Sequence, residues 1–182
     1  MQWTLTRARD ILLETRQTWE QIKNEALNPA EITARYVSVL SVVPAVAFYF
    51  RFFFSSGRVW VHFLSTLLFF VLCIAAVHFT ARVMHAIARE MEVGGEALDF
   101  LKLSAFSFTP VLLGGVFVAF PWLSGLTFIV ALYGLYLLYV GIPMLAKCPD
   151  EKLLNFSVSS MAVLYGAFLV AYVIPRLMMA LF

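Results

Sequence analysis

The stretch "YGLYLLYVGIPMLAKCPDEK" (residues 133–152) decides the fold class of this 182-residue chain. It carries no charge until Lys147, and Asp150, Glu151 and Lys152 follow within a few positions. A second long apolar run begins directly behind these charges. Apolar runs of this length, separated by a short charged turn, are typical of two membrane-crossing helices joined as a hairpin.

The composition of the whole chain also indicates a protein that lies in a lipid bilayer. Hydrophobic residues make up 62% of the sequence, against roughly 45–50% in soluble globular proteins. Charged residues make up 13%, and the mean hydropathy is +0.88. A domain of this size has too little interior to hide so much apolar surface from water. The net charge of +2 gives no argument for a nucleic-acid partner.

Five runs are long enough to cross a hydrocarbon core, which needs about 20 apolar residues per helix. We place them at residues 36–54, 59–80, 103–120, 123–145 and 153–175. Backbone polar groups in lipid must bond within their own segment, and none of the runs alternates as a barrel strand does. The predicted class is therefore all-α, a polytopic protein with five transmembrane helices. Residues 29–182 form this five-span domain, and residues 1–28 precede it.

The orientation follows from lysine and arginine, which concentrate on the cytosolic side of membranes. With the N-terminus inside, ten of the 13 lysines and arginines face the cytosol. The outer side holds only Arg51, Arg58 and Arg176. We therefore predict an N-in, C-out topology, with short outer connections such as "SSG" (residues 55–57).

Start and stop signals flank several spans. The sequence "NPAE" (residues 28–31) offers a helix cap, a proline at the first helical position and an acid in the first turn. The sequence "CPDE" (residues 148–151) repeats proline plus acids before the fifth span. We expect Gly94-Gly95 to end the helix that continues out of the second span.

The N-terminal segment, residues 1–28, is predicted to be a cytosolic amphipathic helix. Ala8, Leu12, Trp19 and Ile22 recur at helical spacing, while charges of both signs lie elsewhere. Such a helix lies either on the membrane surface or under the bundle. The sequence leaves both alternatives open. The segment has no continuous apolar core, so we do not expect a cleavable signal peptide.

Ionisable groups at the cytosolic span ends form one candidate site. His78, Arg82 and His85 share a helix face in the second span. With Arg35 and Lys102 from neighbouring helix ends, they could bind an anion or a phospholipid headgroup. The alternative is that these side chains reach the interface without a specific ligand.

Metal binding and catalysis find little support. His78 and His85 lie about 10.5 Å apart along a helix, too far for one shared ion. There is no HExxH, CxxC or phosphate-cradling glycine loop. We therefore expect no catalytic, cofactor or metal-binding residues. Prolines at 44, 110, 143 and 175 interrupt spans, which fits either kinks or an ion path as in transporters.

A second candidate site is a face of the fifth span. It consists of small or mildly polar residues at helical spacing, which allow close approach and interhelical hydrogen bonds. The members are Asn155, Ser159, Ala162 and Gly166. This helix-contact face could serve the bundle itself or a second copy of the chain.

Three stretches carry a family resemblance. They are "GGEALDFLKLSAFSFTPVLLGGV" (residues 94–116), the quoted hairpin (residues 133–152), and "YVSVLSVVPAVAFYF" (residues 36–50) preceded by Thr18, Trp19 and Ile22. Together they resemble the Yip-one domain family of five-span membrane proteins (Ypt/Rab-interacting proteins). The resemblance covers nearly the whole chain and implies the fold predicted above.

The resemblance is to the short bacterial branch. Eukaryotic members carry a long cytosolic N-terminal region with an Asp-Leu-Tyr-Gly-Pro motif, which is absent here. The implied location is a bacterial inner (cytoplasmic) membrane. Eukaryotic relatives bind prenylated small GTPases, but the residues linked to that role cannot be placed in this chain, so carrying over GTPase binding would rest on fold analogy alone.

We therefore expect a non-catalytic, multi-pass membrane protein that organises partners at its cytosolic face. The expected partners are membrane lipids, with a protein partner or a second copy of the chain as further alternatives. The competing hypothesis is a transporter, channel or lipid scramblase for a small solute, ion or lipid.

Overall fold

The computed structural model describes residues 2–53 and 59–181, and these residues form helices joined by short connections. Five helical segments are long and apolar enough to cross a membrane: Pro29–Arg51, Val59–Glu90, Ala97–Ala119, Leu126–Leu145 and Asp150–Met178. The predicted all-α class and the five spans are thus confirmed. The predicted span end at Phe54, the "SSG" connection and Arg58 lie outside the described residues.

Several spans are assembled from more than one helical element. The elements in chain order are α1 (Gln2–Leu13), α2 (Thr15–Asn24), α3 (Pro29–Glu31), the π-helix η1 (Ile32–Val37), α4 (Ser38–Phe53), α5 (Val59–Glu90), α6 (Ala97–Ser107), α7 (Thr109–Gly114), the 3-10 helix η2 (Gly115–Ala119), α8 (Leu126–Leu145) and α9 (Asp150–Leu181). The first span joins α3, η1 and α4, and the third joins α6, α7 and η2.

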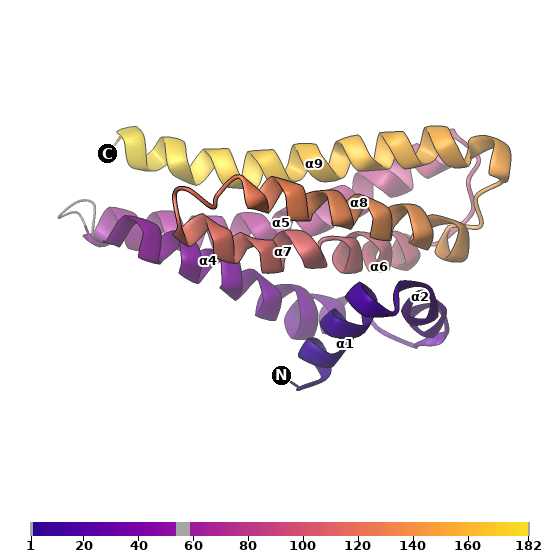
Figure 1. The fold of residues 1–182 in the computed structure, drawn as a ribbon. Coiled ribbons are helices and arrows are strands. Elements are labelled where there is room, and N and C mark those ends of the chain that lie inside the picture. Colours follow the sequence, from indigo (N-terminus) through magenta and orange to yellow (C-terminus); the bar gives the residue numbers. More distant parts are fainter. Residues whose placement is uncertain (1, 54–58, 182) are drawn as a thin grey trace.

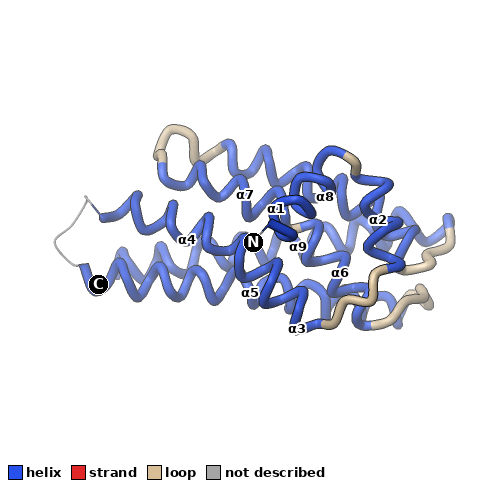
Figure 2. The backbone as a smooth tube through the Cα atoms, turned by 90° about the horizontal axis from the view of Figure 1, so that it is seen from below, coloured by secondary structure: helices blue, strands red, loops and turns tan. Residues whose placement is uncertain are grey.

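The long helices run side by side as an elongated bundle (Figure 1). Helix α9 lies along α5, and α6–α7 lies in the middle, between α4, α5 and α8. One end of the bundle, on the right of Figure 1, holds α2, the α5–α6 connection (residues 91–96) and the α8–α9 connection (residues 146–149). We call it the basal end. Seen from below, α1 and α2 cross the bundle toward this end (Figure 2).

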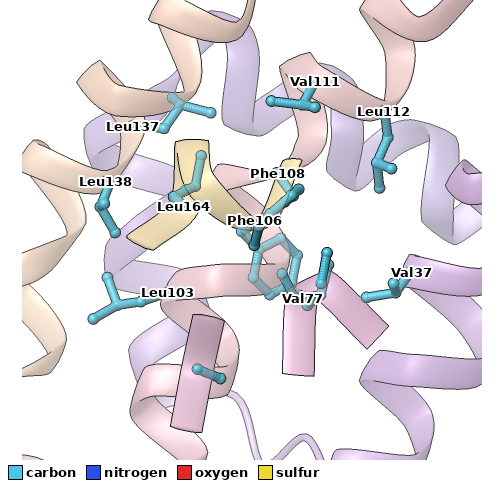
Figure 3. Packing of buried hydrophobic residues seen from close by; sticks show 14 of the residues in the cluster. Val37, Val77, Leu103, Phe106, Phe108, Val111, Leu112, Leu137, Leu138 and Leu164 are labelled. Carbon is cyan, nitrogen blue, oxygen red and sulfur yellow. The ribbon is translucent and has the colours of Figure 1, made fainter. Parts of the chain in front are cut away.

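The third span is the centre of the molecule. Its most apolar 18-residue window is 83% buried, far more than that of any other span. Helix α6 packs against α5 and α8, and α7 packs against α4 and α8. Figure 3 shows Phe106 and Phe108 at this centre, with Leu137 of α8 on one side and Val37 on the other. The third span is therefore surrounded mainly by other helices of the protein.

The helices extend beyond the predicted apolar runs. Helix α5 continues to Glu90, whereas hydropathy placed the end of the second span at residue 80. Helix α9 begins at Asp150, whereas hydropathy placed the start of the fifth span at residue 153. The difference arises because a hydropathy window measures the hydrocarbon core. A helix can continue into the headgroup layer, where its charged side chains reach water.

The predicted cap forms at the first of the two proline motifs. Asn28 Oδ1 accepts from the Glu31 amide at 2.8 Å, and the Glu31 carboxylate accepts in return from the Asn28 amide at 3.4 Å. This reciprocal pair is a capping box with Pro29 at the first turn. Helix α9 likewise starts with Asp150 and Glu151 in its first turn. Helix α5 ends four residues before the glycine pair.

Candidate functional site at the basal end

The N-terminal segment packs under the bundle. It forms two helices, α1 and α2, separated at Glu14, where one amphipathic helix was predicted. Trp19 and Ile22 of α2 are completely buried, and Thr15 is nearly so. Of the two alternatives left open by the sequence, the structure therefore shows contact with the protein's own helices.

Trp19 makes the central contact of α2. Its indole Nε1 donates a hydrogen bond of 3.1 Å to the backbone carbonyl of Leu137 in α8. The ring lies over Gly141, where an added Cβ would come within 2.7 Å of Trp19 Cε2. It also meets the ring of Phe106 edge-on, with centroids 6.1 Å apart. A glycine in α8 thus makes room for the tryptophan that holds α2 in place.

A second set of aromatic rings joins α1 to the same centre. Tyr36 of η1 lies between Trp3 and Phe106, with ring centroids 6.1 Å and 4.5 Å away. Its hydroxyl pairs with Thr109 Oγ1 at 2.6 Å, which satisfies a polar group that is otherwise fully buried. Phe106 is therefore contacted by both Tyr36 and Trp19, from two separate N-terminal elements.

Lys102 lies in the interior instead of at an open anion site. Its residue is only 4% exposed, and its Nζ donates to the carbonyls of Ile22 and Glu25, each at 2.9 Å. These carbonyls end α2, where the partial negative charge of the helix favours a cation. The structure thus places Lys102 under α2, apart from the other residues of the predicted headgroup site.

The two connections at the basal end contact each other. A Cβ added to Gly94 would lie 3.4 Å from Lys147 Cβ, and Gly95 adopts a φ of +115°. The ammonium of Lys152 donates to the Met91 carbonyl at 2.8 Å and pairs with Glu92 at 3.1 Å. The glycine pair thus allows the α5–α6 connection to approach the α8–α9 connection closely.

Beside these connections lies a recess of about 190 Å³ between α5, α6 and the start of α3. We call it the Arg82 recess, and its lining includes Pro29, His78, Arg82, His85, Leu98 and Leu101. None of its lining residues is acidic. The structure therefore brings together three of the five predicted headgroup residues.

The two histidines of the Arg82 recess are held in place. His78 Nε2 lies 3.0 Å from Thr33 Oγ1, and the His85 ring stacks on Phe100 with centroids 5.4 Å apart. Arg82 is exposed and forms no hydrogen bond or ion pair with the part of the chain that the structure describes. Its guanidinium keeps its donors available for an outside acceptor.

Arg35 lies apart from the Arg82 recess. Its side chain is 72% exposed and pairs with Glu31 of the same helical turn at 3.7 Å. It lines a different depression together with Trp3 and Thr4 of α1. The predicted five-residue set is thus divided among a recess, a buried helix cap and a separate surface.

The three stretches that carry the family resemblance meet in this structure. Trp19 and Tyr36 contact Phe106, and Trp19 also contacts Leu137. The sequence profile of the Yip1 domain matches residues 9–172. The chain belongs to the Yip1 domain family. No curated protein and no solved structure matches it.

The Yip1 domain is found in multi-pass membrane proteins, in agreement with the five apolar helices. The match begins at residue 9, so it includes most of the N-terminal segment as well as the spans. The docking of α2 through Trp19 and Lys102 thus lies within the family domain. Sequence reasoning missed the role of Lys102, and no local pattern marks it, because its partners are backbone carbonyls 77 and 80 residues away.

The predicted helix-contact face of α9 points away from the Yip1 bundle. Asn155, Ala162 and Gly166 are exposed, and Ser159 is partly so. A Cβ added to Gly166 would meet no described atom within 4 Å. The bundle instead uses the opposite side of α9, which includes Phe156 and Leu164. Of the two roles left open, this face does not serve contact within the bundle.

The centre of the bundle is closely packed. An enclosed cavity of about 10 Å³ lies among apolar side chains that include Pro44, Phe69 and Leu112. This volume is about that of one water-sized sphere. Among the described residues, no group of three or more His, Cys, Asp or Glu side chains is placed to hold a metal ion.

Proposed function

We propose that this Yip1 domain protein is a non-catalytic membrane component that binds anionic phospholipid headgroups at its cytosolic face. The Arg82 recess is the binding site in this proposal. The protein would thereby organise lipids, and through them protein partners, in a bacterial inner (cytoplasmic) membrane. The N-in, C-out orientation expected from the lysine and arginine distribution puts the basal end in the cytosol.

The observation that carries the proposal is the free guanidinium of Arg82 in a recess without acidic lining. Arg is well suited to phosphate because its planar fork donates two parallel hydrogen bonds. His78 and His85 lie on the same helix face and offer further donors. The capping-box acids of α6, Glu96 and Asp99, are not among the residues that line the recess.

The test compares lipid retention by variants of the full chain. The protein is reconstituted in bilayer discs that contain equal amounts of phosphatidylglycerol and phosphatidylethanolamine, and is then extracted in mild detergent. Retained lipids are quantified by mass spectrometry. Arg82→Glu should lower retained phosphatidylglycerol about tenfold, because one charge-assisted phosphate contact is replaced by repulsion.

Arg89→Glu is the matched control, since Arg89 is an exposed arginine two turns further along α5 that lines no part of the recess. The proposal fails if Arg82→Glu and Arg89→Glu retain the same phosphatidylglycerol as the parent chain. Solute flux or lipid scrambling above that of empty vesicles, lost in a Pro110→Ala variant, would favour the transport hypothesis in its place.

A further inference from the structure

A large apolar groove runs along the side of the first span, outside the Arg82 recess. It lies between α4 and the η2 end of the third span and has a volume of about 990 Å³. Every lining residue is apolar, and those at its rim include Leu5, Val42, Val46, Phe50, Val116 and Phe120. We call it the α4 groove. These six side chains are each about half exposed.

The walls of the α4 groove are held by contacts beneath it. Gly115 lies directly against Pro44, and a Cβ at that glycine would overlap the proline ring. Toward the far end, Arg51 donates to the carbonyl of Val118 at 3.2 Å, which ties α4 to η2. The groove is thus a fixed feature between two bonded elements, and small residues such as Ala47 and Ala119 give it depth.

The basal end of the groove continues into a polar depression. This depression has a volume of about 280 Å³ and is lined by Trp3, Thr4, Ala34, Arg35 and Val39. Val39 also lines the α4 groove, so the two spaces adjoin. Thr4 Oγ1 donates to the Arg35 carbonyl at 2.6 Å, which fixes α1 beside η1.

Arg35 is the available cation of this depression. It lies in the π-helical turn η1, a rare form that is frequent at functional sites. Its pair with Glu31 at 3.7 Å is weak, because both side chains are exposed to solvent, which screens the attraction. Arg7, which stacks over the Trp3 ring, is already engaged with Glu25 at 2.7 Å.

We propose that the α4 groove and the Arg35 depression together bind one glycerophospholipid. Its phosphate pairs with Arg35, and one acyl chain lies along α4. The α4 groove is wholly apolar and has a cation, Arg35, beside one end. This arrangement matches a phospholipid, which has a charged head and an apolar tail. An extended peptide would leave its backbone polar groups unpaired against such a lining.

The dimensions of the groove fit an acyl chain of one leaflet. Val39 and Phe50 are 11 residues apart, which is about 16.5 Å of helix at 1.5 Å per residue. This is about half of the roughly 30 Å hydrocarbon core. With its phosphate at Arg35, the lipid would come from the leaflet that faces the basal end, and its tail would extend along α4 toward Phe50.

The test uses the full chain in vesicles of phosphatidylethanolamine and phosphatidylglycerol with a trace of phosphatidylcholine that carries a photoactivatable diazirine in its acyl chain. After illumination, crosslinked residues are mapped by mass spectrometry. We expect adducts to concentrate on Val42, Val46 and Phe50. Val71 of α5, which is equally exposed but does not line the α4 groove, should give about a tenfold lower yield.

Two variants remove the site. Val46→Trp places a bulky ring in the groove from an exposed position, and Arg35→Gln removes the phosphate partner. Each should reduce the groove adducts about tenfold, while the matched changes Val71→Trp and Arg89→Gln should leave them unchanged. Because Val46 is half exposed, its substitution leaves the core packing intact.

Adducts distributed in proportion to exposure, and insensitive to both variants, would show only the ordinary lipid annulus and overturn the proposal. Disulfide-linked dimers of a Val46→Cys variant would also overturn it, since a second copy of the chain would then fill the groove. Arg82→Glu should leave the groove adducts unchanged, because the Arg82 recess shares no lining residue with this site. The two lipid proposals are therefore tested independently of each other.

Discussion

The indole of Trp19 donates its hydrogen bond to the backbone carbonyl of Leu137, and 118 residues of chain separate the two. This bond joins the N-terminal segment to the fourth span. The same ring fills the space left by Gly141. The N-terminal segment is thus part of the folded core of the Yip1 domain.

Trp19→Ala should strongly destabilise the protein. Truncation of a fully buried Trp typically costs about 3–5 kcal/mol in the free energy of unfolding, and here a buried carbonyl also loses its donor. Chemical unfolding in detergent micelles measures the loss. Trp60→Ala is the control, because Trp60 is 80% exposed and its removal should change the free energy of unfolding little. Equal stability of the two variants would contradict the packing of α2 under the bundle.

Gly141→Ala should also destabilise the chain, for the opposite reason. The new Cβ would lie 2.7 Å from Trp19 Cε2 and 2.8 Å from Leu103 Cδ2, so side chains in the core would have to shift. Overpacking of this kind costs about 1–3 kcal/mol. Gly125→Ala adds the same methyl group where no described atom lies within 4 Å, and it should leave the melting temperature unchanged.

Lys102→Met should loosen α2 without unfolding the spans. The change removes both hydrogen bonds that hold the end of α2, each worth about 1.5–3 kcal/mol for a charged donor. We expect trypsin to cut at Arg16 and Lys23 at least about tenfold faster, since cleavage follows the population of the opened segment. Arg89→Met, which removes an exposed cation, is the control. Unchanged cleavage would mean that Lys102 does not hold the segment.

Hydropathy was sufficient to predict the five spans, and the motifs "NPAE" and "CPDE" predicted where the first and fifth spans begin. Each of these features depends on residues close together in the sequence, such as Asn28 with Glu31. The membrane requires every backbone group to be satisfied within its own helix, so local patterns determine the class of fold. Tertiary contacts then decide which side of each helix is enclosed.

The candidate sites were less predictable, because they depend on tertiary contacts between residues far apart in the sequence. Lys102, Arg35 and Arg82 are equivalent in a sequence reading, since each is a cation near a span end. In the structure, Lys102 caps the end of α2, Arg35 lines the depression beside the α4 groove, and Arg82 lies in the Arg82 recess without a described partner. Their roles depend on where α1 and α2 pack, and the mixed charges of that segment did not distinguish the membrane surface from the bundle.

Cys148 offers a direct test of the orientation. It is half-buried in the α8–α9 connection, whereas Cys73 is buried in α5. A membrane-impermeant maleimide should label Cys148 in inside-out vesicles and not in right-side-out ones, if the basal end is cytosolic. Gly125→Cys, made in a Cys148→Ser background, should show the reverse pattern. Labelling of Cys148 from the outer side would contradict the N-in, C-out topology.

The labelling of Cys148 should also depend on pH. Burial raises the pKa of this thiol, the ammonium of Lys152 opposes the shift, and the carboxylate of Asp150 adds to it. Since the thiolate is the reactive form, the labelling rate at neutral pH should be lower than that of a free cysteine. The rate should still be rising at a pH where free cysteine has levelled off. A pH–rate profile measured on inside-out vesicles checks the sign.

The exposed face of α9 should contact a second copy of the chain. Asn155, Ser159, Ala162 and Gly166 face away from the bundle, and small or polar residues in a membrane favour close helix contacts with interhelical hydrogen bonds. Gly166 also borders a groove of about 300 Å³ between α5 and α9, which can receive a helix ridge.

We expect an Ala162→Cys variant, with the native cysteines replaced, to form disulfide dimers in membranes. A Val71→Cys control on an exposed part of α5 should remain monomeric, and Gly166→Leu should abolish the Ala162→Cys dimer by blocking close approach. Absence of that dimer, or its persistence with leucine at position 166, would show that this face contacts lipid alone.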